Sequence, residues 1–419
     1  MRVSIITYGS LGDVRPLVAL GAGLVRAGHS VVLPADREFR PLIERHGLEH
    51  RPLSGDVRAV TQGGGAADAL FRRGVNPVQL TRALVRMAQD HGEAWTREYL
   101  EASRGCDLLV AAGLGFYTGA GIAESLGVPW AGVGLQPMGP TRAFPPPLMK
   151  PPAFRLPGLV NIALHLGLMQ VVWQGFRPAI NRARRNVLGL PPIPLAGPGP
   201  RMMREKPALL YAHSPQVLAK PADWLDFMHV TGFWYLDEGA EWEPPVSLRR
   251  FLDAGPPPVY VGFGSMGGYD PAATTALVLE ALGDRRAVLS AGWGGLDAKA
   301  LPSTVYGLES APHDWLFPRM AAVVHHGGAG TTAAALRAGV PAFVVPFLGD
   351  QPFWGARVHA LGVGPAPLPR KELTPSRLAA ALALMDEPDM RTRAAALGAR
   401  IRAEDGVGTA VRILEQAVR

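Results

Sequence analysis

Residues 321–352 hold the feature that most constrains this chain: two short apolar runs, each followed by a turn of polar or small residues. The first run, Ala321–Val324, leads into His325, His326 and a glycine-rich turn, after which the alanine-rich stretch Thr332–Ala338 predicts a helix. Such a turn presents free backbone N–H groups and the positive end of the helix dipole to a ligand. The segment therefore predicts an anion site at a helix N-terminus.

Small residues in this turn suit a diphosphate. Gly327, Gly328 and Gly330 allow a phosphate to approach the backbone, and Thr331 and Thr332 supply hydroxyl donors.

The second apolar run, Ala342–Val345, leads to Asp350 and Gln351. A carboxylate beside an amide is the kind of pair that holds sugar hydroxyls. A diphosphate site followed by a sugar site indicates a nucleotide-sugar ligand.

The rest of the chain reads as two α/β halves. Strand-like runs in the first half alternate with helical stretches, which predicts a parallel, doubly wound sheet flanked by helices. The predicted strands are Val3–Ile6, Val31–Pro34, Leu108–Ala111 and Trp130–Gly132, and the predicted helices are Val14–Gly28, Glu38–Arg45 and Thr118–Leu126. The pattern restarts after the proline-rich and acidic stretch Asp237–Pro258, with strands expected near Val259, Ala287, Val305, Ala322 and Ala342.

Five segments, in order along the chain, resemble the GT-B glycosyltransferases that use nucleotide-sugars. They are similar above all to sterol glucosyltransferases and to glycopeptide and macrolide antibiotic glycosyltransferases. The segments are Gly9–Pro16, Trp173–Asn181, Gly262–Met266, Pro312–Leu316 and the 325–352 segment.

This resemblance implies two Rossmann-like domains with the active site in the cleft between them. An acceptor-binding domain is expected over residues 1–236, a linker over 237–258 and a donor-binding domain over 259–400. Residues 401–419 are expected to form a helix that crosses back to the first domain.

Asp13 is the candidate general base. It follows the first strand on a glycine turn, and a carboxylate there can remove the proton of an attacking acceptor hydroxyl. The resemblance assigns that role to the acid at this place. From the pattern alone, an aspartate that caps the next helix is the simpler interpretation. Candidate acceptor contacts are Ser10, Gly12, Thr141 and Phe144, although Ser10 also suits a plain turn.

The resemblance also places the donor. His326 and Ser265 are expected on the diphosphate and Trp315 on the base, although a buried structural tryptophan fits Trp315 nearly as well. The remaining donor candidates are Gly328, Gly330, Thr331, Asp350 and Gln351. His325, the neighbour of His326, is expected to pack or to form a hydrogen bond. No metal and no cofactor are expected. The co-substrate is UDP-glucose or, since Ala334 replaces an acid of plant relatives, a dTDP-sugar.

Two rival functions remain open. Gly262 to Gly267 fits G-x-G-x-x-G after a strand, which suggests an NAD(P)-dependent oxidoreductase with Glu280 on the ribose. That alternative leaves the 325–352 segment unexplained. A non-catalytic sugar-nucleotide-binding protein would not need Asp13.

The net charge and the cysteine content indicate where in the cell the protein acts and which binding partners to expect. The formal charge is +7, but without a basic cluster alternating with aromatic residues it does not predict nucleic-acid binding. The single cysteine, Cys106, and the absence of a signal peptide favour the cytoplasm. Residues Leu156–Phe176 carry no charge and predict an amphipathic helix. It either packs on its own domain, lines an apolar acceptor cleft, or touches a membrane weakly.

Overall fold

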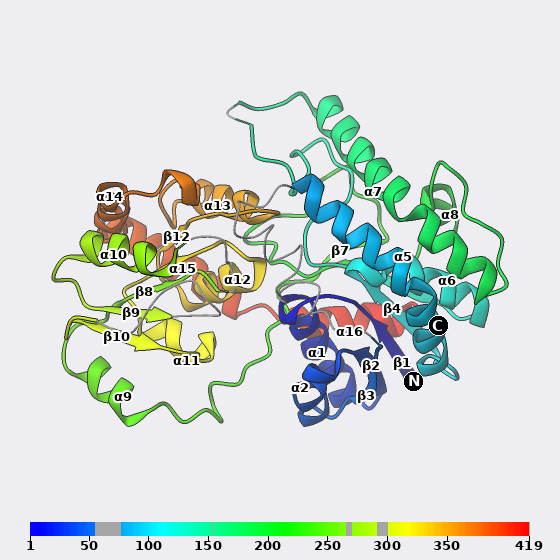
Figure 1. The fold of residues 1–419 in the computed structure, drawn as a ribbon, viewed down its shortest axis with the longest axis horizontal. Helices are drawn as coiled ribbons and strands as arrows, with labels where there is room; N and C mark the ends of the chain where they lie inside the picture. Colours follow the sequence, from blue (N-terminus) through cyan, green and yellow to red (C-terminus); the bar gives the residue numbers. More distant parts are fainter. Residues whose placement is uncertain (55–76, 153, 265–269, 291–300, 419) are drawn as a thin grey trace.

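The computed structural model describes residues 1–54, 77–152, 154–264, 270–290 and 301–418. Within them the chain forms two parallel sheets, each flanked by helices (Figure 1). The predicted α/β fold of two Rossmann-like units is therefore present.

The first sheet has the strand order β3-β2-β1-β4-β5-β6-β7 among the described residues. Its core joins apolar residues of β1, β2 and β4 to the inner face of α1. The strands are β1 Arg2–Ile6, β2 Ser30–Ala35, β3 Glu49–Pro52, β4 Leu108–Ala112, β5 Trp130–Gly134, β6 Ala208–Tyr211 and β7 Met228–Val230. The helices are α1 Leu11–Arg26, α2 Arg40–Arg45, α5 Pro77–Ala102, α6 Phe116–Leu126, α7 Gly158–Asn186 and α8 Gly199–Glu205.

The second sheet has the order β10-β9-β8-β11-β12 among the described residues. Its strands are β8 Val259–Gly262, β9 Ala287–Ser290, β10 Val305–Leu308, β11 Ala322–His325 and β12 Ala342–Val344. Its helices are α10 Pro271–Leu282, α11 His313–Leu316, α12 Ala329–Ala338, α13 Gln351–Ala360, α14 Pro375–Met385 and α15 Pro388–Arg402. Helix α12 begins three residues earlier than the sequence predicts, because Gly328 already takes the N-cap position.

The last helix, α16 Gly406–Gln416, leaves the second unit and packs against α1 (Figure 1). Its Ala410, Val411 and Leu414 belong to the core of the first sheet, whereas Ile401 at the end of α15 belongs to the second.

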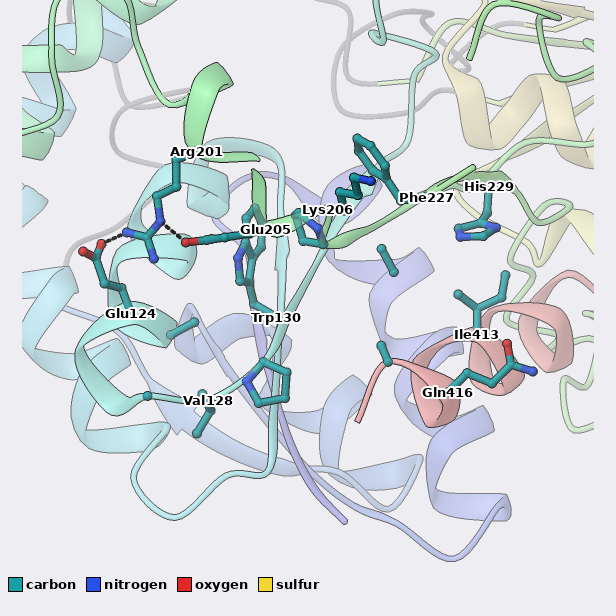
Figure 2. Close-up of a pocket in the computed structure, with 16 residues that line it drawn as sticks. Glu124, Val128, Trp130, Arg201, Glu205, Lys206, Phe227, His229, Ile413 and Gln416 are labelled. Atoms are coloured by element: carbon teal, nitrogen blue, oxygen red, sulfur yellow. Dashed lines mark hydrogen bonds and ion pairs between the residues drawn. The ribbon is translucent and has the colours of Figure 1, made fainter. Parts of the chain in front are cut away.

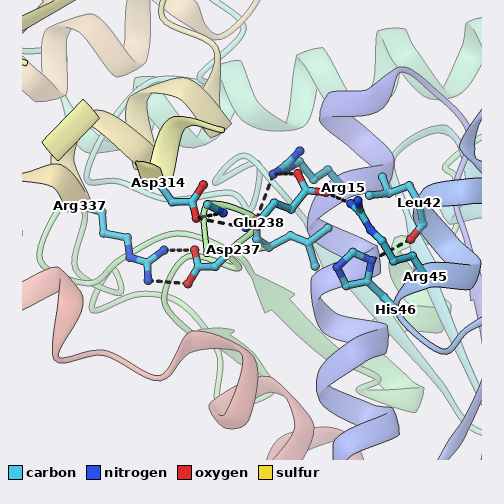
Figure 3. A network of polar contacts seen from close by, with 10 residues as sticks. Arg15, Leu42, Arg45, His46, Asp237, Glu238, Asp314 and Arg337 are labelled. Atoms are coloured by element: carbon cyan, nitrogen blue, oxygen red, sulfur yellow. Dashed lines mark hydrogen bonds and ion pairs between the residues drawn. The ribbon is translucent and has the colours of Figure 1, made fainter. Parts of the chain in front are cut away.

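Acidic residues at the start of the linker contact both units (Figure 3). Glu238 pairs with Arg15 of α1 and Arg45 of α2, while Asp237 pairs with Arg337 of α12. Further along, α9 Val246–Asp253 packs Leu248 into the second core.

Helix α7 departs from its expected form. It is longer than predicted, and the inward side chains include Asn161, His165 and Trp173. Val160 and Val171, two apolar residues of the predicted amphipathic helix, are exposed. The helix packs along α5, so it lies on its own domain, but with an apolar face outward.

Candidate active site

The predicted acceptor-side and donor-side loops follow strands at which each sheet reverses its order. In the first sheet the reversal lies between β1 and β4, and the loop after β1 carries Asp13. In the second it lies between β8 and β11, and the turn after β11 carries His326. Parallel sheets bind ligands at the carboxyl ends of strands at such reversals. Topology alone therefore marks these two loops as the site.

Asp13 lies in the first turn of α1, with Ser10 at the N-cap position. The prediction that Asp13 precedes the helix is wrong by one turn. Its Oδ2 accepts hydrogen bonds from the Ser10 backbone N–H at 2.8 Å and from the Ser10 hydroxyl at 3.0 Å. Asp13 is therefore not the N-cap residue that the simpler interpretation expected. Its carboxylate supports the start of the helix from the third helical position, and the two contacts with Ser10 fix where the carboxylate lies.

Glycine is required beside this carboxylate. Gly9 has a φ of 154°, and a Cβ added there would lie 2.2 Å from Asp13 Oδ2. Because Gly9 has no side chain, the Asp13 carboxylate can lie directly against the Gly9 backbone.

Asp350 of the second unit lies close enough to Asp13 to affect its titration. Burial raises the pKa of the Asp13 carboxyl, and repulsion from Asp350 raises it further. Asp350 is itself hydrogen-bonded by Gln136, from the loop after β5. The two units therefore meet where a base and a sugar-binding carboxylate were predicted.

His326 is held between two glycines. A Cβ at Gly328 would lie 2.5 Å from His326 Nε2, and one at Gly264 would lie 3.2 Å from Cε1. Burial lowers the pKa of His326 to about 4, so the ring is neutral near pH 7. Its Nδ1 is buried and has no hydrogen-bond partner among the described residues. A neutral imidazole offers one N–H donor to an anionic ligand.

His325 has a structural place. Its Nδ1 accepts the Gly327 backbone N–H at 3.1 Å, and the side chain is fully buried. This hydrogen bond fixes the turn that presents His326. No group of three or more potential metal ligands occurs among the described residues.

The first turn of α12 faces the same region. Gly330 is exposed and Thr331 is partly exposed, so both are accessible to a ligand. Thr332 is not the phosphate donor that the sequence suggests, because it is buried and its hydroxyl donates to the Gly328 carbonyl at 2.9 Å.

Asp350 and Gln351 begin α13 in different ways. Asp350 occupies the N-cap position without capping through its side chain. Its Oδ2 instead accepts the Trp354 indole N–H at 2.8 Å. Gln351 is buried, and its Oε1 accepts the backbone N–H groups of Phe347 and Leu348. Gln351 thus shapes the loop that carries Asp350.

Trp315 is partly buried and packs against other side chains. Its ring lies 5.0 Å from that of Trp242 in the linker, and the Arg319 guanidinium lies 4.2 Å above it. Ser265, the other predicted donor contact of this region, lies outside the described residues.

The predicted acceptor residues divide into two groups. Ser10 and Gly12 are exposed beside Asp13, and Phe144 reaches Phe353 of α13, with 5.6 Å between the rings. Thr141 does not fit direct acceptor contact, because it is fully buried and its hydroxyl donates to Asp223 Oδ1 at 2.7 Å. It supports the loop that carries Phe144.

A separate cavity of about 580 Å³ lies away from these residues (Figure 2). It is bordered by Trp130 at the start of β5, by Arg201 and Glu205 of α8, and by Ile413 and Gln416 of α16. The cavity therefore opens near the amino ends of the strands, away from the loops that carry the candidate site.

Comparison with known proteins gives matches in both units of the chain. Residues 3–113 match the glycosyltransferase family 28 N-terminal domain, and residues 287–414 match the erythromycin biosynthesis protein CIII-like C-terminal domain. A sterol 3-beta-glucosyltransferase of Arabidopsis thaliana is 35% identical over 98% of this chain and 67% of its own length. The chain belongs to this glycosyltransferase family.

Other relatives extend the comparison. A sterol 3-beta-glucosyltransferase of Aspergillus fumigatus is 37% identical over 99% of this chain, and the chain spans only 30% of the length of that relative. The kitacinnamycin and calicheamicin glycosyltransferases share its fold, with TM-scores of 0.70 and 0.69 at 20% identity, each covering 99% of this chain and 98% of their own. Membership of the family removes the oxidoreductase alternative, and Glu280 is an exposed residue of α10.

Three residues near the site were missed in the sequence. Gln136 follows β5, so its place after the carboxyl end of a strand was a usable signal. Arg15 and His313 are on different units, yet the Arg15 charge helps to lower the pKa of His313, after the larger effect of burial, to about 4. No local pattern indicates that proximity, because it depends on how the two units meet.

Proposed function

We propose that this chain is an inverting glycosyltransferase that moves a hexose from a nucleoside diphosphate sugar to the hydroxyl of an apolar acceptor. The observation that carries the proposal is the position of Asp13 near Asp350, while the turn after β11 supplies His326 and the N-terminus of α12. A base, a sugar contact and a diphosphate site are thereby provided by loops of two facing units.

In the proposed reaction Asp13 accepts the proton of the acceptor hydroxyl as its oxygen attacks C1 of the sugar. The bond between C1 and the diphosphate oxygen breaks, and its electron pair stays on the diphosphate. The neutral His326 ring and the free N–H groups of α12 stabilise the added charge. Attack from the face opposite the leaving group inverts C1.

Glucose from UDP-glucose is the proposed first choice of donor, and a dTDP-sugar is the alternative. Relatives named sterol 3-beta-glucosyltransferases support the glucose and a hydroxylated sterol or similar apolar acceptor. The alternative donor is supported by a structurally similar glycosyltransferase that was solved in complex with thymidine diphosphate. We place the reaction in the cytoplasm, which is consistent with Cys106 being a free, buried thiol.

The test is incubation with UDP-glucose or dTDP-glucose and a 3β-hydroxysterol, with the product analysed by mass and by proton NMR. An α-linked donor is expected to give a β-glycoside, recognised by its large anomeric coupling. An α-linked product contradicts Asp13 as the base of a single displacement. Hydrolysis of the donor without transfer to any hydroxylated acceptor contradicts the proposed activity.

A further inference from the structure

Exposed apolar side chains gather on one segment of the first unit. Of the fifteen large apolar side chains that are exposed among the described residues, ten lie between Leu148 and Met203. Eight of them form what is termed here the α7 face: Leu148, Met149, Phe154, Leu159, Val160, Leu166, Met169 and Val171. Phe154, Leu159 and Val171 are 70%, 71% and 66% exposed. Apolar surface concentrated in this way marks a contact with another apolar surface.

The orientation of α7 is fixed by its inner side. Asn161 Nδ2 donates to the Arg142 carbonyl at 2.9 Å, and His165 Nε2 lies 3.1 Å from the Phe144 carbonyl. The Trp173 indole donates to the Leu195 carbonyl at 3.1 Å. Helix α7 is long and apolar enough to cross a membrane by length and composition. These hydrogen bonds and its packing along α5 hold it on the domain instead, with the α7 face outward.

Positive charge lies at both ends of the same segment. Residues 140–206 contain ten lysines and arginines and one acidic residue, which gives them a formal charge of +9 in a chain of +7. Lys150 and Arg155 are exposed in the loop before α7, and Arg182 and Arg185 are exposed near its end. Arg184 and Arg201 pair with Glu124, which lies outside this segment, so that counting Glu124 lowers the charge to +8. The segment that exposes these apolar side chains therefore still carries a large positive excess.

This combination distinguishes between possible occupants. Nucleic acid binds charge but gains nothing from exposed leucine and valine side chains. A second copy in a twofold contact would bring two strongly positive segments together. An anionic bilayer offers both an apolar interior and negative headgroups.

We propose that the α7 face docks on an anionic lipid bilayer. The loop that precedes α7 also carries Phe144, which contacts Phe353 across the two units. Docking would therefore set the acceptor side of the cleft beside the lipid, where apolar acceptors dissolve. That last step rests on the proposed function, whereas the docking does not.

The docking is tested by sedimentation of the full chain with phosphatidylcholine vesicles, with and without phosphatidylserine, and without donor or acceptor. The chain is expected to bind the phosphatidylserine vesicles at low salt and to dissociate as salt rises, because surface charges are screened over about 8–10 Å at physiological ionic strength. Failure to sediment with phosphatidylserine vesicles at low salt overturns the proposal.

Matched variants identify the surface. Leu159→Ser with Val171→Ser should lower the vesicle partition coefficient at least about tenfold, because both side chains lose their apolar contact with lipid. Val246→Ser with Leu384→Ser removes two exposed apolar side chains elsewhere and should leave it unchanged. Equal effects of the two pairs contradict docking through α7.

The contribution of positive charge to vesicle binding is tested by a second pair of matched double variants. Lys150→Gln with Arg155→Gln should weaken binding and its salt dependence, whereas Lys371→Gln with Arg400→Gln on the second unit should not.

If light scattering shows a dimer that the Leu159 and Val171 changes dissociate, while vesicles bind neither form, the face is covered by a second copy and the proposal is wrong. Vesicle binding without glycosyl transfer would reject the proposed function and leave the docking intact.

Discussion

At the scale of single residues, the close approach of Asp13 to Gly9 gives a direct test of the base. Asp13→Asn keeps the hydrogen-bonding shape but cannot accept the acceptor proton, so turnover should fall by roughly 10²–10⁴. Gly9→Ala should also impair turnover, because its Cβ would lie 2.2 Å from Asp13 Oδ2. Gly105→Ala is the control: Gly105 has a φ of 70° but nothing within 4 Å of an added Cβ. Rates near that of the parent enzyme for Asp13→Asn, at unchanged stability, would exclude it as the base.

The same carboxylates predict a pH effect. If Asp13 is the base as proposed, its ionised form is the active one, and kcat/KM should decrease as the pH drops through its pKa, which lies above the ordinary aspartate value. Asp350→Asn removes the neighbouring charge that helps to raise this pKa. In the Asp350→Asn variant, the acid limb of the pH profile of kcat/KM should therefore move to lower pH, even if the maximum rate also falls. A pH–rate profile with an unmoved limb would show that the two groups are not coupled.

At the scale of elements, α12 and α13 are expected to recognise different parts of the donor. His326→Ala should weaken both the intact donor and free nucleoside diphosphate, since both carry the diphosphate. Asp350→Ala should affect the intact donor alone, by about 1.5–3 kcal/mol for a lost charge-assisted hydrogen bond. Calorimetric titration of both ligands separates these outcomes, with the fold of the Asp350 variant checked because the Trp354 indole loses its acceptor. Equal losses for the two ligands would place Asp350 outside the sugar site.

A chelator gives an independent check on α12 and His326. If these groups carry the leaving diphosphate, EDTA should leave transfer in place. Complete loss that magnesium or manganese restores would contradict the mechanism.

Elements with a strong local pattern were predictable, and those that depend on their neighbours were not. The turn between β11 and α12 was found because apolar residues, glycines and alanines follow one another there. Strand β3 reads Glu-His-Arg-Pro and has no apolar alternation, because it is an edge strand. The predicted roles of Asp13 and His326 rest on the family resemblance and stay predictions. The predicted contacts of Gln351 and Thr141 did not foresee the backbone and side-chain partners that these residues acquire on folding.

At the scale of the whole molecule, the linker joins the two units through charge. Glu238→Gln should lower the melting temperature, because Glu238 pairs with both Arg15 and Arg45 and is 18% exposed. Each such pair contributes about 0.2–1 kcal/mol when it lies near the surface. The difference in melting temperature between the variant and the parent protein should disappear in 1 M salt, where the screening length is about 3 Å. The exposed Glu241 supplies the control variant, Glu241→Gln. A difference that persists in 1 M salt would argue for lost packing rather than lost charge.

The path of α16 has a consequence for how this chain is made. Val407 packs so closely on α1 that a Cβ at Gly23 would lie 2.2 Å from its Cγ1. Ala410 and Leu414 complete the core that begins with Val3 and Leu17. During translation the first unit therefore emerges long before the helix that closes it, and the entire second unit must leave the ribosome in between. Until residues 406–416 have been synthesised, the first unit cannot complete its core, and one side of α1 stays uncovered. Synthesis that stops before Gly406 would leave that apolar side open to chaperones and proteases.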